Sequence, residues 1–391
     1  MFSCRTSHDR TPSPFTQALE VARRAGTPLL DLTLSNPTES AIAYEQTSIL
    51  RALASPASMR YEPEPFGPRA ARELLVQHWA ERGFRVLEQQ ILISASTSES
   101  YSLIFKLLCD PGHEVLVPVP SYPLFEQLAR FEGVRAVPYE LGFDGAWFID
   151  FAELERRVTP ASRAIVVVSP NNPTGHYLRR GELARLASFG LPIVSDEVFE
   201  AYPIDPPADR ALSILEVETV PVFALSGLSK LAALPQMKLA WMTLGGPGAF
   251  IDEATRRLEH LADAFLSPSA PVLAALGSLL ETRHTAQKQI QARLVENASW
   301  LRGAVAGSAV SVLPIEGGWY AMIRLPRIQD DESWALEVLE RAQVVVQPGY
   351  FYDACDEGLL VLGLLTPPET FRAGVSRILR VVQDHLQIPN P

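Results

Sequence analysis

The spacing of apolar residues changes repeatedly along the chain, and this pattern predicts alternating strands and helices. Apolar residues recur at helical spacing over 15–24, 70–83 and 98–109. Other runs are short and nearly all apolar, as expected for strands buried on both faces of a sheet. These runs are 114–118, 164–168, 192–195, 222–225 and 239–244, and a further strand is expected over 90–94. The alternation predicts a mostly parallel sheet between helices.

A proline-rich stretch at 266–271 marks a change in this pattern. Long helical patterns follow through 271–281 and on to 305, then expected strands at 317–323, 344–346 and 359–364 and a last helix over 368–386. We therefore expect a large domain over 45–265 and a small α+β domain over 266–391. An N-terminal arm over 1–44, with a strand expected at 29–34, joins the small domain.

Composition and charge indicate which kinds of molecule the protein binds. The chain has 391 residues, 47% hydrophobic and 20% charged, which suits a folded enzyme with a sizeable core. Its net charge of -11, with scattered Lys and Arg, argues against nucleic acid and anionic membranes as partners. Three widely spaced cysteines suit free thiols, and the polar start, residues 1–14, is unlike a signal peptide. We expect a cytoplasmic protein that acts on small molecules, with no membrane span.

Three short motifs carry candidate chemistry. Lys230 ends SGLSK (226–230), Asn172 lies in SPNNPTG (169–175), and Asp196 lies in SDEV (195–198). An amine, an amide and an acid are the groups that an electron-sink pyridine cofactor needs from its protein. Each motif alone has a plain explanation as a surface lysine, a turn or an acid that begins a helix. We assign that plain role to the neighbouring Glu197.

In order and spacing, these motifs resemble the class I and II aminotransferases of the fold type I pyridoxal phosphate enzymes. The resemblance runs from about Asp31 to the last helix and implies an α/β fold with the two domains expected above. It implies that Lys230 forms a Schiff base with pyridoxal 5'-phosphate and then shuttles the substrate proton. It also implies that Asp196 keeps the pyridine nitrogen protonated, which makes Lys230 and Asp196 the catalytic pair.

The same resemblance implies further contacts to the cofactor. Asn172 would donate to the ring oxygen and Tyr122 would stack on the ring, although core packing explains Tyr122 equally well. The phosphate would be bound by Ser96, Thr97 and Ser98 at a helix N-terminus, by Ser229 and by Lys238. Capping by Ser96 explains the first group without a ligand, and both roles are compatible. Tyr61 would reach the phosphate of a neighbouring subunit, which implies a homodimer with shared active sites.

Two departures from the family concern the cofactor. Lys238 stands where arginine is usual, and an ammonium cannot form the paired bonds of a guanidinium. Phe199 stands where many members have a tyrosine that bonds the ring oxygen. We expect the loss of that donor to raise the pKa of the lysine–cofactor Schiff base.

A third departure concerns the substrate. Val361 occupies the position where the family carries the arginine that binds the substrate carboxylate. Either another group, such as Asn36 or an arginine brought in by folding, binds the carboxylate, or the substrate has none there. Arg372 and Arg377 in the next helix are interpreted as ordinary solvated charges.

These observations favour a ping-pong aminotransferase that moves an amino group from a donor, expected to be an amino acid, to a keto acid. A pyridoxal phosphate lyase, decarboxylase or cyclising enzyme of the same fold would use the same cofactor groups. A non-catalytic binding module is a more remote alternative, supported by the three departures alone. No histidine pair has metal-ligand spacing and no Gly-x-Ser-x-Gly motif occurs, so neither metal nor serine hydrolysis is expected.

Overall fold

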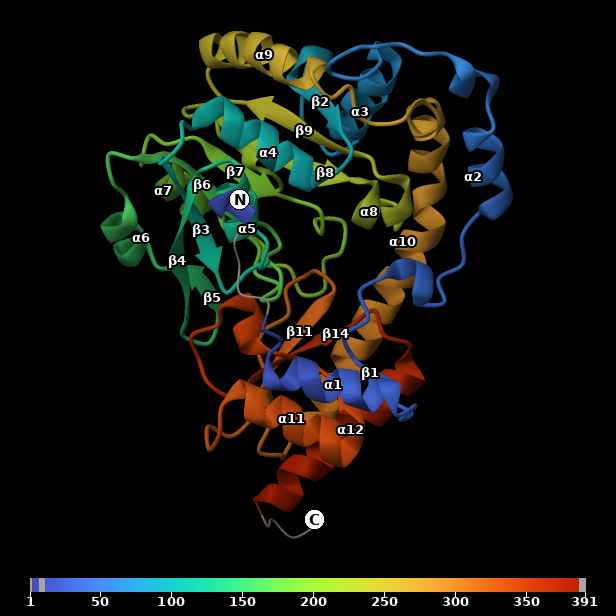
Figure 1. The fold of residues 1–391 in the computed structure, drawn as a ribbon, viewed down its shortest axis with the longest axis vertical. Coiled ribbons are helices and arrows are strands. Elements are labelled where there is room, and N and C mark those ends of the chain that lie inside the picture. Colours follow the sequence, from blue (N-terminus) through green and yellow to red (C-terminus); the bar gives the residue numbers. More distant parts are fainter. Residues whose placement is uncertain (1, 7–10, 387–391) are drawn as a thin grey trace.

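Residues 2–6 and 11–386 are described by the computed structural model of the protein (Figure 1). The interpretation of the polar start includes residues 1 and 7–10, which lie outside the described residues. The described residues form three sheets: a large one in the upper part of Figure 1, a smaller four-stranded one below it, and a two-stranded one. Within the described residues, no helix has the length and apolarity needed to cross a bilayer.

The large domain is built on an eight-stranded sheet. In spatial order its strands are β2 (Ile91–Ser94), β9 (Ala240–Gly245), β8 (Val222–Gly227), β7 (Ile193–Asp196), β6 (Ser162–Val168), β3 (Glu114–Val119), β4 (Arg135–Phe143) and β5 (Trp147–Ile149). The pairs from β8 through β7, β6 and β3 to β4 are parallel, whereas β9 and β5 pair antiparallel with their neighbours. The expected mostly parallel sheet is confirmed, with antiparallel strands towards its edges.

Helices cover both faces of this sheet. They are α3 (Arg69–Glu81), α4 (Thr97–Leu108), α5 (Phe125–Phe131), α6 (Phe151–Arg157), α7 (Arg180–Ala187), α8 (Leu228–Leu231) and α9 (Gly248–Asp263). A further helix, α2 (Gln46–Leu53), packs against α10 (Ala270–Val305). Alternate residues of a central strand enter different cores: Val166 packs with the side chains of α4 and α9, and Ile165 packs with the opposite core. This alternation decides which strand residues can reach a ligand on the α4 face.

The small domain combines a four-stranded sheet with three helices. Its strands, in spatial order, are β10 (Ser311–Val312), β11 (Tyr320–Arg324), β14 (Leu359–Gly363) and β13 (Gln347–Pro348). The helices are α1 (Pro14–Arg24), α11 (Asp331–Ala342) and α12 (Pro368–His385), and β1 (Leu30–Asp31) pairs in parallel with β12 (Val344–Val345). The strand expected over 29–34 is therefore only two residues long. Its pairing attaches the N-terminal arm to the small domain, as Figure 1 shows.

One long helix joins the two domains. The patterns at 271–281 and on to 305 form a single helix, α10 (Ala270–Val305), which begins within the last residues of the proline-rich stretch, with Pro271 in its first turn. It contacts α2, α3 and α8 of the large domain and β10 and α12 of the small one. The division of the chain at residue 266 remains a prediction, because the helix that follows it belongs to both packing units.

Trp79 on α3 is a well-defined anchor of the large-domain core. Its side chain is fully buried, and its indole Nε1 donates to the Thr243 hydroxyl at 2.8 Å. The Arg82 guanidinium lies over the ring at 4.4 Å and Phe84 packs edge to face at 5.7 Å. The ring thereby connects α3 to strand β9.

Replacing Trp79 with alanine is expected to lower the free energy of unfolding by about 3 to 5 kcal/mol, because it leaves a cavity and an unpaired Thr243 hydroxyl. Denaturant-induced unfolding measures this loss. The control is Val295→Ala on α10, where the side chain is 44% exposed. That change is expected to cost less than about 0.5 kcal/mol. Equal losses in the two variants would contradict the assignment of Trp79 as a core anchor.

Candidate active site

Most of the candidate cofactor residues lie at one edge of the large sheet. Strands β3, β6, β7 and β8 run parallel, so their carboxyl ends share that edge, where ligands of open α/β sheets bind. The residues delivered there are Tyr122 after β3, Asn172 after β6, Asp196 at the end of β7, and Ser229 and Lys230 after β8. Strand β2 is antiparallel to β9, which is antiparallel to β8, so β2 delivers Ser96 to the same edge.

Lys230 lies in the single turn of α8 and has an aromatic surrounding. Its Nζ lies 5.2 Å from the centre of the Trp319 ring and 5.7 Å from that of Phe199. The Tyr202 hydroxyl donates to the Lys230 carbonyl at 2.6 Å, which fixes the backbone of the turn. Burial lowers the pKa of the Lys230 amine, and the Asp196 carboxylate opposes this shift. A lowered pKa increases the fraction of neutral, nucleophilic amine.

Asp196 faces the α4 side of the sheet because it alternates in register with Val194, which packs in that core. Burial raises its pKa to about 6, while the Val198 amide, Lys230 and Tyr101 act in the opposite direction. The Val198 N–H donates to Asp196 Oδ1 at 3.2 Å. A carboxylate this deeply buried is stabilised by a cation in contact with it.

Asn172 and Tyr122 flank this carboxylate. Asn172 is buried and its side-chain Oδ1 has no hydrogen-bond partner among the described residues. The Tyr122 ring is 40% exposed and packs edge to face on Phe125 at 6.3 Å. Burial, and then the Asp196 charge, raises the pKa of Tyr122, so its phenol lies within electrostatic range of that carboxylate. Both residues thus remain available for a ligand at this edge.

The phosphate-binding candidates divide into two groups. Ser96 is the N-cap of α4 and its hydroxyl accepts from the Glu99 N–H at 3.1 Å, so the expected capping is confirmed. Thr97 and Ser98 open the helix, where free amides favour an anion. Ser229 lies one residue before Lys230 and is partly exposed. Lys238, in contrast, is exposed and has a left-handed backbone at φ 50°.

Two other candidates have surroundings that differ from the expected roles. Asn36 caps the short helix η2 (Pro37–Glu39): its Oδ1 accepts from the Thr38 N–H and its Nδ2 donates to Glu39. Its amide is therefore committed within its own turn. Tyr61 is 75% exposed and lines a cavity of about 490 Å³ with Ser267 and Ser269, residues that lie just before α10.

The position expected to carry a carboxylate-binding arginine is occupied by an apolar side chain that solvent does not reach. Val361 in β14 is fully buried and pairs with Met322 on β11 and Gln347 on β13. The two arginines of the next helix have other partners: Arg372 forms an exposed ion pair with Glu296, and Arg377 donates to the Ala342 carbonyl. Neither replaces the missing group at Val361.

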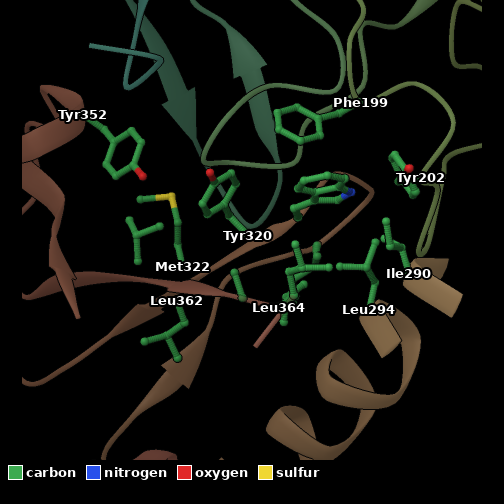
Figure 2. Packing of buried hydrophobic residues seen from close by; sticks show 14 of the residues in the cluster. Phe199, Tyr202, Ile290, Leu294, Tyr320, Met322, Tyr352, Leu362 and Leu364 are labelled. Atoms are coloured by element: carbon green, nitrogen blue, oxygen red, sulfur yellow. The ribbon is translucent and has the colours of Figure 1, made fainter. Parts of the chain in front are cut away.

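The sequence analysis missed the aromatic residues that the small domain contributes. Trp319 is fully buried and packs on Phe199 at 5.4 Å and on Tyr202 at 5.2 Å. Tyr320 packs on Phe199 at 6.1 Å and on Tyr352 at 6.5 Å, and Figure 2 shows these rings between the two domains. The pair of aromatics directly after Gly317-Gly318 was the signal, since glycines allow close approach of a neighbouring backbone.

The plain role assigned to Glu197 is wrong. Its side chain is buried on the face of the sheet opposite to Asp196, where it accepts from the Ser213 hydroxyl at 2.9 Å and the Ile214 N–H at 2.8 Å. Arg82 lies 3.5 Å away. The strand alternation that places Asp196 near α4 necessarily turns its neighbour into the other core.

Comparisons with known proteins agree on one family. The model of "Aminotransferase class I and II" matches residues 27–378. The chain belongs to this family. The aminotransferase is 26% identical over 338 residues to glutamate-pyruvate aminotransferase AlaA of Escherichia coli K12, covering 83% of each chain. It is 27% identical over 372 residues to aspartate/prephenate aminotransferase of Thermus thermophilus, covering 94% of each.

Solved structures have the same fold as the aminotransferase. An alanine aminotransferase from Pyrococcus furiosus superposes with a TM-score of 0.88 at 22% identity, covering 98% of this chain and all of the other. An aminotransferase from Escherichia coli superposes with a TM-score of 0.86 at 23% identity, covering 98% of both chains. These likenesses show the fold type I architecture.

Aminotransferases of this family use pyridoxal phosphate, and the residues of the edge fit that cofactor. Asn172 offers a buried side-chain amide with no hydrogen bond at Oδ1, and its Nδ2 is the atom that could donate to a ring oxygen. Asp196 offers a buried carboxylate that a protonated pyridine nitrogen would neutralise. Lys230 offers the amine. Among the described residues, no group of three or more His, Cys, Asp or Glu side chains could hold a metal ion.

Glu197 generates a prediction about stability and pH. Burial raises its pKa to about 7 from 4.5, so the folded state holds the proton more tightly than the unfolded chain. The resulting stabilisation is fully present below about pH 4.5 and is lost as the pH rises through about 7. Glu197→Gln titrates no proton there. Relative to this variant, the wild type is expected to lose up to about 3 kcal/mol between about pH 5 and about pH 8.

Denaturant unfolding of the wild type and Glu197→Gln across that range measures the difference. The matched control is Glu218→Gln at an exposed position, which should leave the pH profile unchanged. A constant difference between wild type and Glu197→Gln would show that Glu197 does not titrate differently on folding.

Proposed function

We propose that this aminotransferase exchanges an amino group between an amino acid and a keto acid, with Lys230 as the amine that binds the cofactor. The observation that carries the proposal is the Lys230 amine itself: burial lowers its pKa, the Asp196 charge acts on it, and its Nζ lies 5.2 Å and 5.7 Å from the centres of the Trp319 and Phe199 rings. An amine with a lowered pKa is more often neutral, and a neutral amine can act both as a nucleophile and as a base.

Each residue of the site has a distinct task in this proposal. Pyridoxal phosphate, when bound, supplies an electron-accepting ring to the reaction. Asp196 holds a proton at the ring nitrogen, and the Val198 amide orients its carboxylate. Asn172 donates to the ring oxygen, and Tyr122 covers the ring. Lys230 would supply the amine that accepts the proton from the substrate Cα and later returns it.

The phosphate is assigned to the N-terminus of α4 and to Ser229. The free amides of Thr97 and Ser98 and the positive end of the helix dipole favour an anion, while Ser96 caps the helix. Lys238 is exposed and Asn36 is engaged within its own turn, so we give both a weaker claim to cofactor or substrate binding.

A second function is favoured by Val361. Val361 is apolar and buried, whereas many members of the family have an arginine at this position. The loss of that arginine also suits a lyase, decarboxylase or cyclising enzyme of the same fold. These enzymes would share the tasks of Lys230, Asp196 and Asn172. They would not pass the amino group to a keto acid.

Borohydride reduction of the protein with pyridoxal phosphate, followed by peptide mass mapping, tests the lysine. The cofactor is expected on Lys230, and Lys230→Ala is expected to lose covalent attachment and at least about 10³-fold in activity. The control is Lys238→Ala, which should retain attachment. Attachment at another lysine would refute the assignment. Repeated turnover of an amino acid to an amine and CO2, to an elimination product or to a cyclic product, without amination of an acceptor keto acid, would favour the second function.

We also propose that the active unit is a homodimer. Tyr61 is far more exposed than is usual for an aromatic side chain, and other large apolar side chains of the chain are exposed too: Leu50, Met59 and Phe265 are 65%, 90% and 56% exposed. Such side chains commonly mark a protein interface. In a symmetric dimer this surface would carry Tyr61 to the phosphate of the second subunit.

The three free cysteines suit the reducing cytoplasm, which we propose as the compartment.

Subunit mixing tests the shared site. Lys230→Ala and Tyr61→Phe are each expected to be impaired, because each lacks one component of every active site. In a mixed dimer, one site combines Lys230 of one subunit with Tyr61 of the other and is intact. Co-refolded mixtures are therefore expected to be several-fold more active than either variant alone. No gain in mixtures that contain mixed dimers by native mass spectrometry would refute the arrangement.

A further inference from the structure

A charged contact joins the two domains beside the active site. Glu316, in the loop between β10 and β11, pairs with Arg179 of the large domain through two hydrogen bonds at 2.5 and 2.8 Å. Its carboxylate also accepts from the Tyr177 N–H at 2.9 Å. The Glu316 and Arg179 side chains are only 11% and 20% exposed. A bidentate pair removed from water is geometrically specific.

The backbone around Glu316 tightens the same contact. Its carbonyl accepts from the Ile204 N–H at 2.8 Å and the Asp205 N–H at 3.1 Å. The Gly318 N–H donates to the Tyr202 carbonyl at 3.0 Å. A Cβ at Gly317 would lie 2.6 Å from the Tyr177 ring. The loop therefore approaches the large domain as closely as a backbone can, which leaves little freedom for sliding.

This loop connects two parts of the active site. On the large-domain side, Tyr177 follows directly on the turn that carries Asn172, and the Asn171 N–H donates to the His176 carbonyl at 2.8 Å. On the small-domain side, Trp319 comes three residues after Glu316 and lies 5.2 Å from Lys230 Nζ. Tyr202, which accepts from Gly318, also bonds the Lys230 backbone. Figure 2 shows Tyr202, Phe199 and Tyr320 in this region.

We propose that Glu316 is a positioning residue of the active site: through Arg179 and the Tyr177 amide, its carboxylate keeps the Trp319 ring against the Lys230 amine. The inference rests on the proposed role of Lys230. With the ring in place, water is excluded from one side of the amine. If the ring withdraws, water reaches the amine and its charged form becomes more favourable.

Several other charged groups lie around the Glu316–Arg179 pair. Besides Glu316, Arg179 faces Asp209 at 3.7 Å, and the Arg179 N–H donates to Glu182 at 2.9 Å. His176 lies between carboxylates, with Nε2 3.1 Å from Glu182 and Nδ1 3.8 Å from Glu316. The charge that acts on Lys230 itself is Asp196. Changing Glu316 therefore alters the surroundings of Lys230 through the position of the loop and not through a direct charge contact.

The chain has only four lysines, Lys106, Lys230, Lys238 and Lys288, so the protonation of Lys230 can be followed by pH-dependent competitive acylation and mass mapping. Full-length protein freed of cofactor is used, and the exposed Lys288 is the internal reference. The midpoint of the Lys230 profile reports its pKa, whatever its accessibility. In the wild type this midpoint is expected below that of Lys288, because burial lowers the pKa of Lys230.

Glu316→Gln is expected to raise the Lys230 midpoint by about one pH unit, because it removes the charge of the bidentate pair and lets the loop retreat. It leaves Arg179 without its partner, so the double variant Glu316→Gln with Arg179→Gln, which removes both charges, is measured as well. The matched control is Glu296→Gln, which breaks the exposed Arg372 pair on α10. It should leave the midpoint unchanged.

An unchanged Lys230 midpoint in the folded double variant would overturn the proposal and leave Glu316 a purely structural role. A raised midpoint in both variants, with thermal unfolding still cooperative, would support it. A wild-type Lys230 that titrates like Lys288 would instead refute the proposed function, so the two failures are distinguishable.

Discussion

The attraction between the Asp196 carboxylate and the Lys230 amine, both withdrawn from water, is the interaction on which the arrangement of the site depends. Burial acts on the two groups in opposite ways, raising the pKa of the acid and lowering that of the amine, and their mutual attraction limits both shifts. Each shift makes the neutral form of its group more accessible than it would be in water. Removing Asp196 would take away the charge that opposes the lowered pKa of Lys230, whereas removing Lys230 would leave Asp196 with the Val198 amide and Tyr101 alone.

The parallel strands explain how residues far apart in sequence reach this pair. The segments after β3, β6, β7 and β8 end at the same edge, and the sequence motifs lie at those ends. This part of the site could be predicted from the chain alone, because a buried apolar strand followed by a polar motif indicates both an element and an edge. Lys230, Asp196 and Asn172 could therefore all be chosen as candidates without knowledge of long-range packing.

Other features depended on packing that the order of residues does not express. Glu197 differs from Asp196 by one position, yet strand alternation buries it in a different core with Arg82. Trp319 reaches Lys230 from another domain, and only the docking of its loop brings the two together. Asn36 has a suitable amide, but local capping engages it. Local hydrogen bonds and domain docking thus compete with roles inferred from residue type.

The helix α10 has a mechanical consequence. At about 1.5 Å per residue, its 36 residues form a rod about 54 Å long that is packed against both domains. Tilting such a rod by about 5° about one end displaces the other end by about 5 Å. A small change of angle where the helix meets α2 and α3 would thus be amplified into a large displacement of β10 and α12. The helix acts as a lever that pivots where it packs against α2 and α3.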